Sequence, residues 1–434
     1  MQTPIDTETT TNPEVSASRL ALAKSMIQTI EHELENKQQG YEAIPKISFQ
    51  QNLFKSINNP LSLGMIILIL INCLLCFTQP FANIDPATLP ATHTWTWWAT
   101  QEYLNDKPTP PVVLIGSSLF MHSVSRQDAD FLNKDLDYVH HHYSAYLSKQ
   151  LQKRFHSRQS LLCFNFSLPG DLVSDDYMIM RGLFQGKHKP QYVILGLSLR
   201  DFVDNAVNCP GSMPPFRYLR RFTDIDDIVN LAFPRLWQRF DYYIGKFFYP
   251  WAKKLDIQAW ASEQTKLILA PLAQKLCAPS LLNELDYRKH VPANLHSEVE
   301  EGMAIVKTHI PYNYDANYAD YIRRYGKGNS YRWMFNIQEQ FFARLVPMAK
   351  AKQIKLIIVN MPLTKDNMNL VPAGAYERYI NLLKTQASKY DVPFMDLNQN
   401  AAFVKSDFYD TAHMTSTGGK KLLDMIANTA AISL

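Results

Sequence analysis

The chain has 434 residues and a formal net charge of +4, and 46 % of its residues are hydrophobic and 12 % aromatic. This length and composition allow a substantial core in one large domain or in two ordinary ones. The mild charge balance, with no basic stripe, argues against nucleic acid as a partner.

Residues 1–60 are interpreted as a cytoplasmic tail that is partly disordered. Residues 1–17 are rich in threonine, proline and acidic side chains, a composition that does not support a packed core. Residues 18–37 carry apolar side chains at helical spacing and predict a short amphipathic helix.

An uncharged apolar segment, Leu61–Phe77, follows this tail. Its 17 residues are at the lower limit for crossing a bilayer. Almost every side of the segment is apolar, which favours a membrane span over a buried core helix. Sixty mostly polar residues precede the segment, too many for an ordinary signal peptide. We therefore predict a transmembrane anchor over residues 61–78.

The charges that flank the apolar segment predict its orientation. Lys46 and Lys55 precede it, whereas only acidic charges follow it before the next basic residue, Lys107. The positive-inside rule then places the N-terminus in the cytoplasm and residues 80–434 in the periplasm or outside the cell.

Residues 79–110 are rich in proline and threonine and contain Trp95, Trp97 and Trp98. This composition predicts a membrane-proximal linker whose aromatic side chains lie at interface depth. A packed loop is an equally good interpretation.

From residue 111 to 434 the pattern predicts one domain in which strands and helices alternate. Five short aliphatic runs are typical of strands buried on both faces. The predicted strands are Val112–Ile115, Leu161–Phe166, Tyr192–Leu195, Ile354–Asn360 and Val392–Leu397. The predicted helices cover residues 127–155, 172–186, 330–352, 374–389 and 417–431. This alternation predicts an α/β fold, a three-layer sandwich around a five-stranded parallel sheet, with its active site at the carboxyl ends of the strands.

Residues 206–325 interrupt this alternation and are interpreted as a largely helical insertion. Between Phe216 and Trp251, arginines are mixed with many aromatic side chains. The mixture predicts either a cap with its own small core or a surface that lies on a membrane or docks a membrane partner.

Three cysteines lie beyond the apolar segment. Cys163 is embedded in a predicted strand and is expected to be a buried thiol. Cys209 and Cys277 can pair if the insertion faces an oxidising compartment, although spacing does not define connectivity.

Gly116-Ser117-Ser118 follows the first predicted strand. A strand-to-helix turn at this point exposes a serine oxygen near a helix N-terminus, where developing negative charge is favoured. Ser118 is the predicted nucleophile, and Ser117 is the weaker candidate. Taken alone, the segment is better explained as an ordinary turn followed by a helix cap.

The segment Asp410-Thr411-Ala412-His413 lies between the last predicted strand and Thr417-Gly418-Gly419. His413 is the predicted general base and Asp410 the group that orients it, because this spacing lets one loop place both side chains on the same side. A surface histidine with a turn-forming aspartate is the alternative interpretation of this motif alone.

Two further segments follow predicted strands. Gly170 is expected to offer its N–H to an oxyanion together with the N–H of Ser118, with Asn165 and Ser167 as contributing side chains. Its alternative is an ordinary loop glycine.

The segment Gly196–Asp201 follows the third predicted strand and is crowded with polar residues. Ser198 and Asn205 are candidates to contact substrate or to complete the oxyanion hole. Arg200 and Asp201 are better explained as a structural ion pair.

No metal or cofactor is expected. His140-His141-His142 resembles a metal cluster, but consecutive histidines on a helix point in different directions, and a solvated helix face explains them better. The sequence shows no phosphate loop, no Cys-x-x-Cys and no dinucleotide fingerprint.

Together these motifs resemble the SGNH/GDSL hydrolase superfamily over about residues 112–205 and 354–431. The resemblance implies that Ser118 of the Gly-Ser-Ser block is the nucleophile, that Gly170 donates to the oxyanion, and that Asp410 and His413 complete a triad. The third block of the family usually reads Gly-x-Asn-Asp, whereas this chain has Gly196-Leu197-Ser198-Leu199. The asparagine donor is therefore missing or replaced, by Ser198 or Asn205.

The Gly-Ser-Ser block, the N-terminal anchor and the outward-facing domain are similar to the branch that contains the lipoteichoic-acid D-alanylation protein and the alginate O-acetyltransferases. This resemblance implies a multipass membrane-bound O-acyltransferase as partner and a cell-envelope polymer or exopolysaccharide as substrate. The resulting hypothesis is an anchored acyltransferase or esterase that acts through a serine acyl-enzyme. The rival hypothesis is a catalytically inactive scaffold of an envelope polysaccharide complex.

Overall fold

The computed structural model describes residues 59–81, 84, 94–137, 139–155, 161–275, 305–306 and 310–433, together with the single residue 28. The chain divides into two compact units, Met1–Phe77 and Thr78–Leu434. The predicted tail therefore lies almost entirely outside the described residues.

The predicted anchor forms helix α3 (Pro60–Thr78), which has 19 residues. No residue of α3 is buried, and the helix is long and apolar enough to cross a membrane by length and composition. It is the one described helix that meets this criterion.

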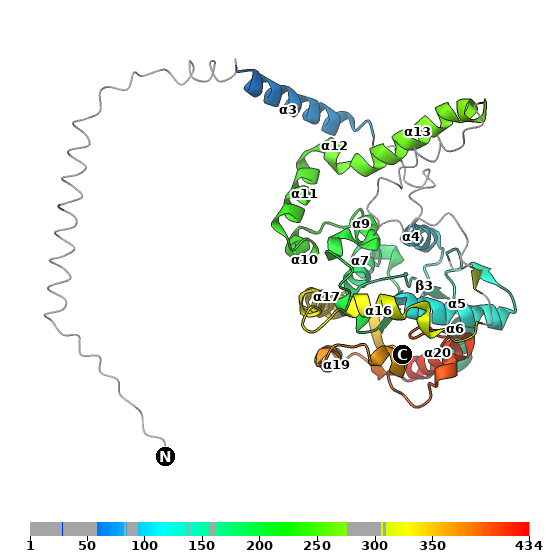
Figure 1. Ribbon diagram of the computed structural model, residues 1–434. Coiled ribbons are helices and arrows are strands. Elements are labelled where there is room, and N and C mark those ends of the chain that lie inside the picture. The colour runs from blue at the N-terminus through cyan, green and yellow to red at the C-terminus, as the bar shows by residue number, and fades with distance from the viewer. Residues whose placement is uncertain are drawn as a thin grey trace. The chain divides into compact units, whose positions relative to one another are not determined.

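A five-stranded sheet forms the centre of the second unit (Figure 1). Its strands are β1 (Val112–Gly116), β3 (Cys163–Asn165), β4 (Tyr192–Leu197), β6 (Lys355–Asn360) and β7 (Phe394–Asp396). They pair in the order β3-β1-β4-β6-β7, and every pairing is parallel. The predicted fold class, an α/β domain with a five-stranded parallel sheet, is confirmed.

The strands are buried on both faces, as their unbroken aliphatic sequences predict. The side chains of β1 from Val112 to Ile115 are at most 2 % exposed. The strand order explains this burial, because the chain passes from β1 to β3 on one side and then returns past β1 to β4. Right-handed crossovers of opposite direction place their helices on opposite faces of the sheet.

The helices accordingly form two groups of neighbours. Helices α5 (Ser118–Leu132), α6 (Ala145–Arg154) and α20 (Ser416–Ser433) pack against one another. Helix α17 (Arg332–Ala351) packs against helices connected to the other crossovers. These are α7 (Val173–Gly182), α8 (Arg200–Val203) and α19 (Ala375–Tyr390). The predicted helices at 172–186, 330–352, 374–389 and 417–431 correspond to α7, α17, α19 and α20.

The predicted helix over residues 127–155 is wrong as a single element. Helix α5 starts earlier and ends at Asn133, which adopts the left-handed conformation (φ 51°, ψ 46°) that stops a helix. A short strand, β2 (Leu136–Asp137), then pairs antiparallel with β5 (Ile305–Val306) of the insertion before α6 begins.

Part of the predicted linker is packed into the domain. Thr94 caps helix α4 (Trp95–Asn105) by accepting a hydrogen bond from the N–H of Trp97 at 3.1 Å. Trp95 and Trp97 are buried, and the fully buried Tyr103 donates to the carbonyl oxygen of His188 at 2.6 Å. These contacts support the packed alternative for this stretch.

The described part of the insertion is largely helical. Its elements include α9 (Pro214–Leu219), α10 (Val229–Ala232), α11 (Leu236–Phe247), α12 (Tyr249–Ala252), α13 (Lys254–Lys275) and α16 (Tyr318–Tyr325). Three short 3-10 helices also lie in it: η4 (Pro210–Ser212), η5 (Asp226–Ile228) and η7 (Tyr314–Ala316).

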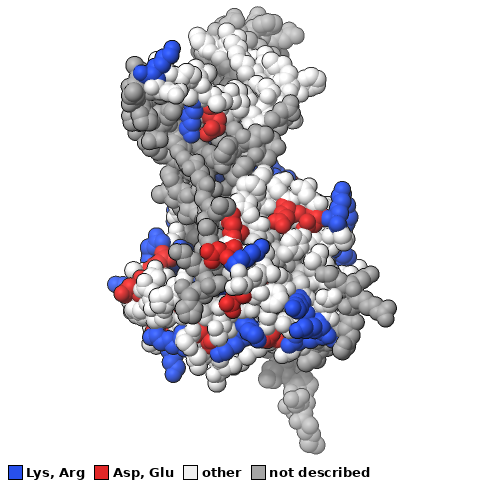
Figure 2. Space-filling model, turned by 90° about the vertical axis from the view of Figure 1, so that its right-hand side faces the viewer, with Lys and Arg blue, Asp and Glu red and all other residues white. Residues whose placement is uncertain are grey.

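The other short helices lie outside the insertion. They are η3 (Gly186–His188), α18 (Lys365–Met368) and η8 (Lys405–Asp407). On the face seen in Figure 2, acidic and basic side chains are interspersed.

The cysteine predictions meet different outcomes. Cys163 is a fully buried free thiol, as expected, and burial raises its pKa to about 12. Cys209 is also a buried free thiol, whereas Cys277 lies outside the described residues.

Candidate active site

The candidate active site begins where β1 ends beside β4. Gly116 has φ +142°, and a Cβ atom there would lie 2.4 Å from the carbonyl oxygen of Gly196 on β4. Only glycine tolerates both this backbone conformation and this close approach. The chain then turns at once into α5, whose first residue is Ser118.

The two serines of this turn have different partners. The Ser117 hydroxyl hydrogen-bonds to the Asp201 carboxylate, and Ser117 is 2 % exposed. The Ser118 hydroxyl instead reaches the Nε2 atom of His413 at 2.9 Å. The structure thus favours Ser118, the serine that the sequence favoured, as the residue beside a base.

His413 is held on its other side by Asp410. The Nδ1 atom of His413 lies 2.7 Å from Asp410 Oδ2. Asp410 Oδ1 accepts hydrogen bonds from the backbone N–H groups of Ala412 at 2.8 Å and His413 at 2.6 Å. A proton on Nδ1 leaves Nε2 as an acceptor, so this geometry suits the transfer of the Ser118 proton to His413.

Asp410 is ionised in this environment. Its side chain is 5 % exposed, and burial acts to raise its pKa. The charge of His413 and the hydrogen bonds from His413 and Ala412 outweigh burial, and the pKa of Asp410 is lowered below its ordinary value. The carboxylate can therefore stabilise an imidazolium next to it.

Close helix packing brings the histidine loop to Ser118. In α20, a Cβ atom on Gly419 would lie 2.2 Å from the carbonyl oxygen of Ser123 in α5, the helix that Ser118 starts. A Cβ atom on Gly418 would lie 2.3 Å from the carbonyl oxygen of Asp407. The prediction that these glycines permit a close approach is confirmed.

The middle of the histidine loop is fixed by residues that are distant in sequence. Thr364 Oγ1 donates to the Thr411 carbonyl oxygen at 2.6 Å. Asn317 Oδ1 accepts from the Thr411 hydroxyl at 2.7 Å and from its N–H at 3.3 Å. Asn317 belongs to the end of the insertion, so the insertion braces the loop that carries Asp410 and His413.

Sequence reasoning missed the aromatic surroundings of His413. The His122 ring contacts His413 edge-on, with centroids 4.7 Å apart, and the Tyr409 ring stacks on His413 at 5.8 Å. Arg126 lies 4.0 Å over the Tyr409 ring. Burial, with the charges of His413 and Arg126, lowers the pKa of His122 well below its ordinary value, so His122 is neutral at neutral pH.

A sequence signal for two of these residues existed. Ser118, His122 and Arg126 are spaced by four residues, so a helix that starts at Ser118 places them on one face. The predicted helix started at residue 127 and hid this pattern.

Gly170 lies at the same edge of the sheet and has φ +72°. Its carbonyl oxygen accepts from Arg200 at 2.8 Å, whereas its N–H has no acceptor among the described residues. As the first residue of α5, Ser118 also has an N–H without an acceptor in its helix. Both predicted oxyanion donors are thus available.

The side chains near Gly170 contribute differently. Asn165 Oδ1 accepts from the N–H of Ser167 at 3.2 Å and so shapes the turn after β3. The Ser167 hydroxyl is buried and has no hydrogen-bond partner in the described part of the chain.

The two candidate replacements for the third-block asparagine are engaged elsewhere. The Ser198 hydroxyl donates to Asp201 at 3.0 Å. Asn205 Nδ2 donates to the carbonyl oxygens of Arg324 and Tyr325, both at 2.9 Å, and so caps α16. These bonds show structural roles for both side chains, and neither of the two retains a free donor for an oxyanion.

Arg200 is the centre of a buried ionic cluster, as the structural interpretation predicted. Its Nη2 atom lies 2.9 Å from Asp204 Oδ2. Its Nη1 atom lies 3.3 Å from Asp201 Oδ1 and donates to the Asp171 carbonyl oxygen at 2.5 Å. Burial raises the pKa of Asp201 despite this pairing.

Three more buried carboxyl groups, Asp171, Asp175 and Asp176, lie beside this cluster. Burial and their neighbours raise the pKa values of Asp171 and Asp176 well above the ordinary value, and burial raises that of Asp175 to about 7. The raised pKa values favour the protonated form of these groups, and Asp171 Oδ1 and Asp175 Oδ2 both accept from the N–H of Leu172.

The three consecutive histidines do not converge. His140, His141 and His142 face the carboxylates of Asp137, Asp128 and Glu102 respectively. They lie in the loop before α6 and not on a helix, and His142 is buried, so the solvated-helix interpretation is wrong. The described residues contain no group of three that fits a metal ion.

No protein-family model and no curated protein matches the chain. Among solved structures, the chain is similar to a protein from Bacteroides fragilis NCTC 9343 described as a "putative acylhydrolase". The match has 11 % sequence identity and a TM-score of 0.29, and it covers 77 % of this chain and 93 % of that protein. So distant a likeness carries no argument about activity, and the site rests on its own geometry.

Proposed function

We propose that the protein is a serine-dependent acyltransferase or esterase of the SGNH type. One observation carries this proposal: the hydrogen-bonded chain from Ser118 through His413 to Asp410, formed by residues 295 positions apart in the sequence. A serine, a histidine and an aspartate without a shared function would not be expected to form one continuous hydrogen-bonded chain over such a sequence separation.

In the first step, the Ser118 hydroxyl gives its proton to His413 Nε2 while its oxygen attacks the carbonyl carbon of an ester. The imidazolium that forms is stabilised by the ionised Asp410. The leaving alcohol takes the proton back from His413, and an acyl-Ser118 intermediate remains. An incoming hydroxyl group or water then gives its proton to His413 and attacks the acyl carbon. The acyl–Ser118 bond breaks, and His413 returns the proton to the Ser118 oxygen.

The tetrahedral intermediates carry a negative oxygen. Backbone N–H groups of Ser118 and Gly170 are the available donors, and the N-terminus of α5 adds a favourable dipole. This oxyanion hole uses neither Asn205 nor Ser198, because their side chains are bound elsewhere.

For the setting of the reaction, we propose O-acyl groups of a cell-envelope polymer or exopolysaccharide as substrate. Helix α3 would anchor the protein, with its N-terminus in the cytoplasm and its domain in the periplasm or outside the cell. A multipass membrane-bound O-acyltransferase would be the donor partner. These assignments are supported by the charge distribution and by the family resemblance.

An inactive scaffold with this fold is the second candidate, favoured by the engagement of Ser198 and Asn205 away from the nucleophile. The experiment that separates the candidates is labelling of the full chain in detergent with a fluorophosphonate probe. The enzyme is labelled, Ser118→Ala abolishes labelling, and Ser117→Ala, which changes the neighbouring serine bound to Asp201, retains it. An unlabelled wild-type protein with native thermal stability would favour the scaffold.

Transfer and hydrolysis are then distinguished with a soluble activated acetyl ester. The full chain is incubated with the ester and an envelope oligosaccharide, and the products are analysed by mass spectrometry. An acetylated oligosaccharide that is absent with Ser118→Ala indicates transfer, whereas release of acetate alone indicates an esterase.

A further inference from the structure

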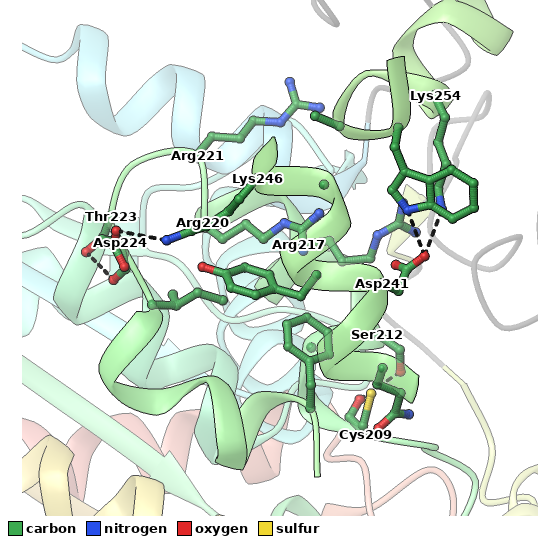
Figure 3. Close-up of a pocket in the computed structure, with 18 of the residues that line it drawn as sticks. Cys209, Ser212, Arg217, Arg220, Arg221, Thr223, Asp224, Asp241, Lys246 and Lys254 are labelled. Carbon is green, nitrogen blue, oxygen red and sulfur yellow. Dashed lines mark hydrogen bonds and ion pairs between the residues drawn. The ribbon is translucent and has the colours of Figure 1, made fainter. Parts of the chain in front are cut away.

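A pocket of about 900 Å³ lies in the insertion, between α9, α11 and α12 (Figure 3). None of its lining residues belongs to the Ser118–His413–Asp410 chain. Five basic and two acidic side chains line it, an excess of three positive charges. The basic residues are Arg217, Arg220, Arg221, Lys246 and Lys254, and the acidic residues are Asp224 and Asp241. The lining therefore favours an anionic ligand.

Most of these basic groups already face a carboxylate. Lys254 Nζ lies 3.2 Å from Asp241 Oδ1, and Arg221 Nη2 lies 3.1 Å from Asp256 Oδ1. Lys246 is paired with Asp226. In Figure 3 the three arginines extend in the same direction, with Lys246 and Lys254 on opposite sides of the pocket.

Arg220 differs from these paired groups. Its guanidinium forms no hydrogen bond and no ion pair with any residue that the structure describes. The pocket leaves it open to solvent, while the surrounding protein atoms and Arg221 lower its pKa. An arginine remains charged despite such a shift, so Arg220 offers an unused fork of donors that fits a phosphate or carboxylate.

The same helix that lines the pocket carries an exposed apolar face. Leu236, Phe240, Tyr243 and Phe247 are 78 %, 67 %, 41 % and 75 % exposed. Their spacing of four, three and four residues places them on one side of α11, a row that we name the α11 stripe. Trp237, which is 63 % exposed, lines the pocket beside this stripe. An anion site next to an apolar surface suits an amphiphile.

The chain that leaves the predicted anchor is bound to this region. The N–H of Phe81 donates to the Tyr249 hydroxyl at 3.1 Å, and their rings stack with centroids 6.4 Å apart. Tyr249 starts α12, whose Trp251 lines the pocket. Phe81 is three residues beyond Thr78, the end of α3, and three residues span at most about 11 Å. If α3 is an anchor, as the proposed function holds, Tyr249 is tethered close to the bilayer surface.

We propose that this pocket binds the anionic, phosphate-bearing headgroup of a bilayer lipid, with the α11 stripe in contact with the acyl chains. Arg220 holds the phosphate with two parallel hydrogen bonds, and Trp237 contacts the boundary between headgroup and chain. The insertion then lies on the membrane surface.

The first test measures binding of a short-chain phosphatidylglycerol to the full chain in detergent. Phosphatidylcholine of the same chain length and inorganic phosphate are the comparison ligands. Phosphatidylglycerol binds more tightly than both, and Arg220→Gln weakens its binding about tenfold or more. Arg344→Gln, which changes an exposed arginine of α17 outside the pocket, leaves binding unchanged.

Three results overturn the proposal: equal binding by phosphatidylcholine, equal binding by the Arg220 variant at native thermal stability, or phosphate that competes as strongly as the lipid. The last result assigns the pocket to a soluble anion. Binding is measured without turnover, so failure of the acyl-transfer proposal leaves this test intact, and retained fluorophosphonate labelling of Ser118 in Arg220→Gln separates the two sites.

The second test uses the full chain in nanodiscs made with brominated phosphatidylglycerol, which quenches tryptophan fluorescence at short range. Part of the quenching disappears in Trp237→Phe, whereas Trp333→Phe, which changes an exposed tryptophan of α17, retains it. Equal quenching in the two variants contradicts a membrane-facing α11.

Discussion

The edge of the sheet at Ser118 and the insertion around α11 differ in whether their side chains find partners within the protein. At the sheet edge, the polar groups of Asp410 and His413 have partners inside the protein, and their side chains are only 5 % and 14 % exposed. On α11, large apolar side chains are exposed, and Arg220 has no described partner. In the first region the side chains of Ser118, His413 and Asp410 are paired with one another, whereas the second region leaves the donors of Arg220 and an apolar helix face without described partners.

This difference indicates where each region finds its stabilising contacts. A buried hydrogen-bonded chain fixes the distances that proton transfer needs, because an unpaired buried group is costly. An exposed row of apolar residues gains free energy only when something covers it. Mutations should therefore act on chemistry in the first region and on association in the second.

The largest expected effect is that of His413→Gln. Without a base for the Ser118 proton, turnover of a soluble activated ester should fall by about 10³-fold or more. Some thermal stability should be lost as well, because the buried Asp410 carboxylate loses its imidazole partner. Turnover is measured with the full chain in detergent. The control is His122→Gln, which changes the ring that contacts His413 edge-on. It should retain most activity, because Ser118 and Asp410 hydrogen-bond to His413 and not to His122. Equal losses for both variants would falsify the assignment of His413 as the base.

Much of this first region was predictable from sequence, because parallel strands bring their carboxyl ends to one edge. Ser118, Gly170 and Asp410–His413 each follow a strand that an aliphatic run revealed. The range of α5 was predicted less well. The strand-to-helix turn at Ser118 was expected, but the predicted helix began only at residue 127, because periodicity does not assign the short apolar run Leu119-Phe120-Met121 to a helix or a strand.

The roles of Ser198 and Asn205 also required the structure. Both follow a strand and have suitable side chains, but their partners, Asp201 and the carbonyl groups of α16, are set by tertiary packing. Likewise, the burial of Trp95 and Trp97 depends on the docking of α4, which composition does not reveal.

A matched pair of glycine substitutions tests the contrast in packing. Gly419→Ala in α20 places a methyl group 2.2 Å from the Ser123 carbonyl oxygen, whereas Gly245→Ala in α11 meets nothing closer than 3.9 Å. Both gain about 1 kcal/mol of helix propensity. Gly419→Ala should nevertheless lower the free energy of unfolding by about 1–3 kcal/mol, because backbone must move.

Chemical denaturation measures these changes, and ester turnover reports whether α20 has shifted His413 from Ser118. Gly245→Ala should be neutral or stabilising and should retain turnover. Similar destabilisation by both variants contradicts the view that only the first region is closely packed.

The buried carboxyl cluster predicts a pH effect confined to the first region. Burial raises the pKa of Asp176, so the folded protein keeps a proton that the unfolded chain has released. The stability contributed by this group therefore falls as pH rises above the ordinary carboxyl pKa. Asp176→Asn removes this loss, and its stability relative to wild type should increase from pH 4 towards neutral pH.

Asp227, in the insertion, predicts a dependence of stability on pH with the opposite sign. Hydrogen bonds from Arg181 lower its pKa, so its contribution is present above the ordinary carboxyl pKa and is lost as pH falls. Asp227→Asn should therefore lose stability relative to wild type at neutral pH and approach it in acid. Unfolding curves across this pH range measure both variants, and parallel behaviour of the two contradicts the pKa directions.

The smallest expected effect on catalysis is that of Phe240→Ser combined with Phe247→Ser on the α11 stripe. Both side chains are exposed, so the free energy of unfolding should change by no more than about 0.5 kcal/mol. Turnover of a soluble ester in detergent should be unchanged, because the stripe does not contact Ser118 or its partners. In nanodiscs that contain phosphatidylglycerol, the same variant should lose the protection of α11 from hydrogen exchange that the wild type shows. A change in soluble-ester turnover would instead mean that the stripe supports the sheet-edge site, and the two regions would no longer be separable.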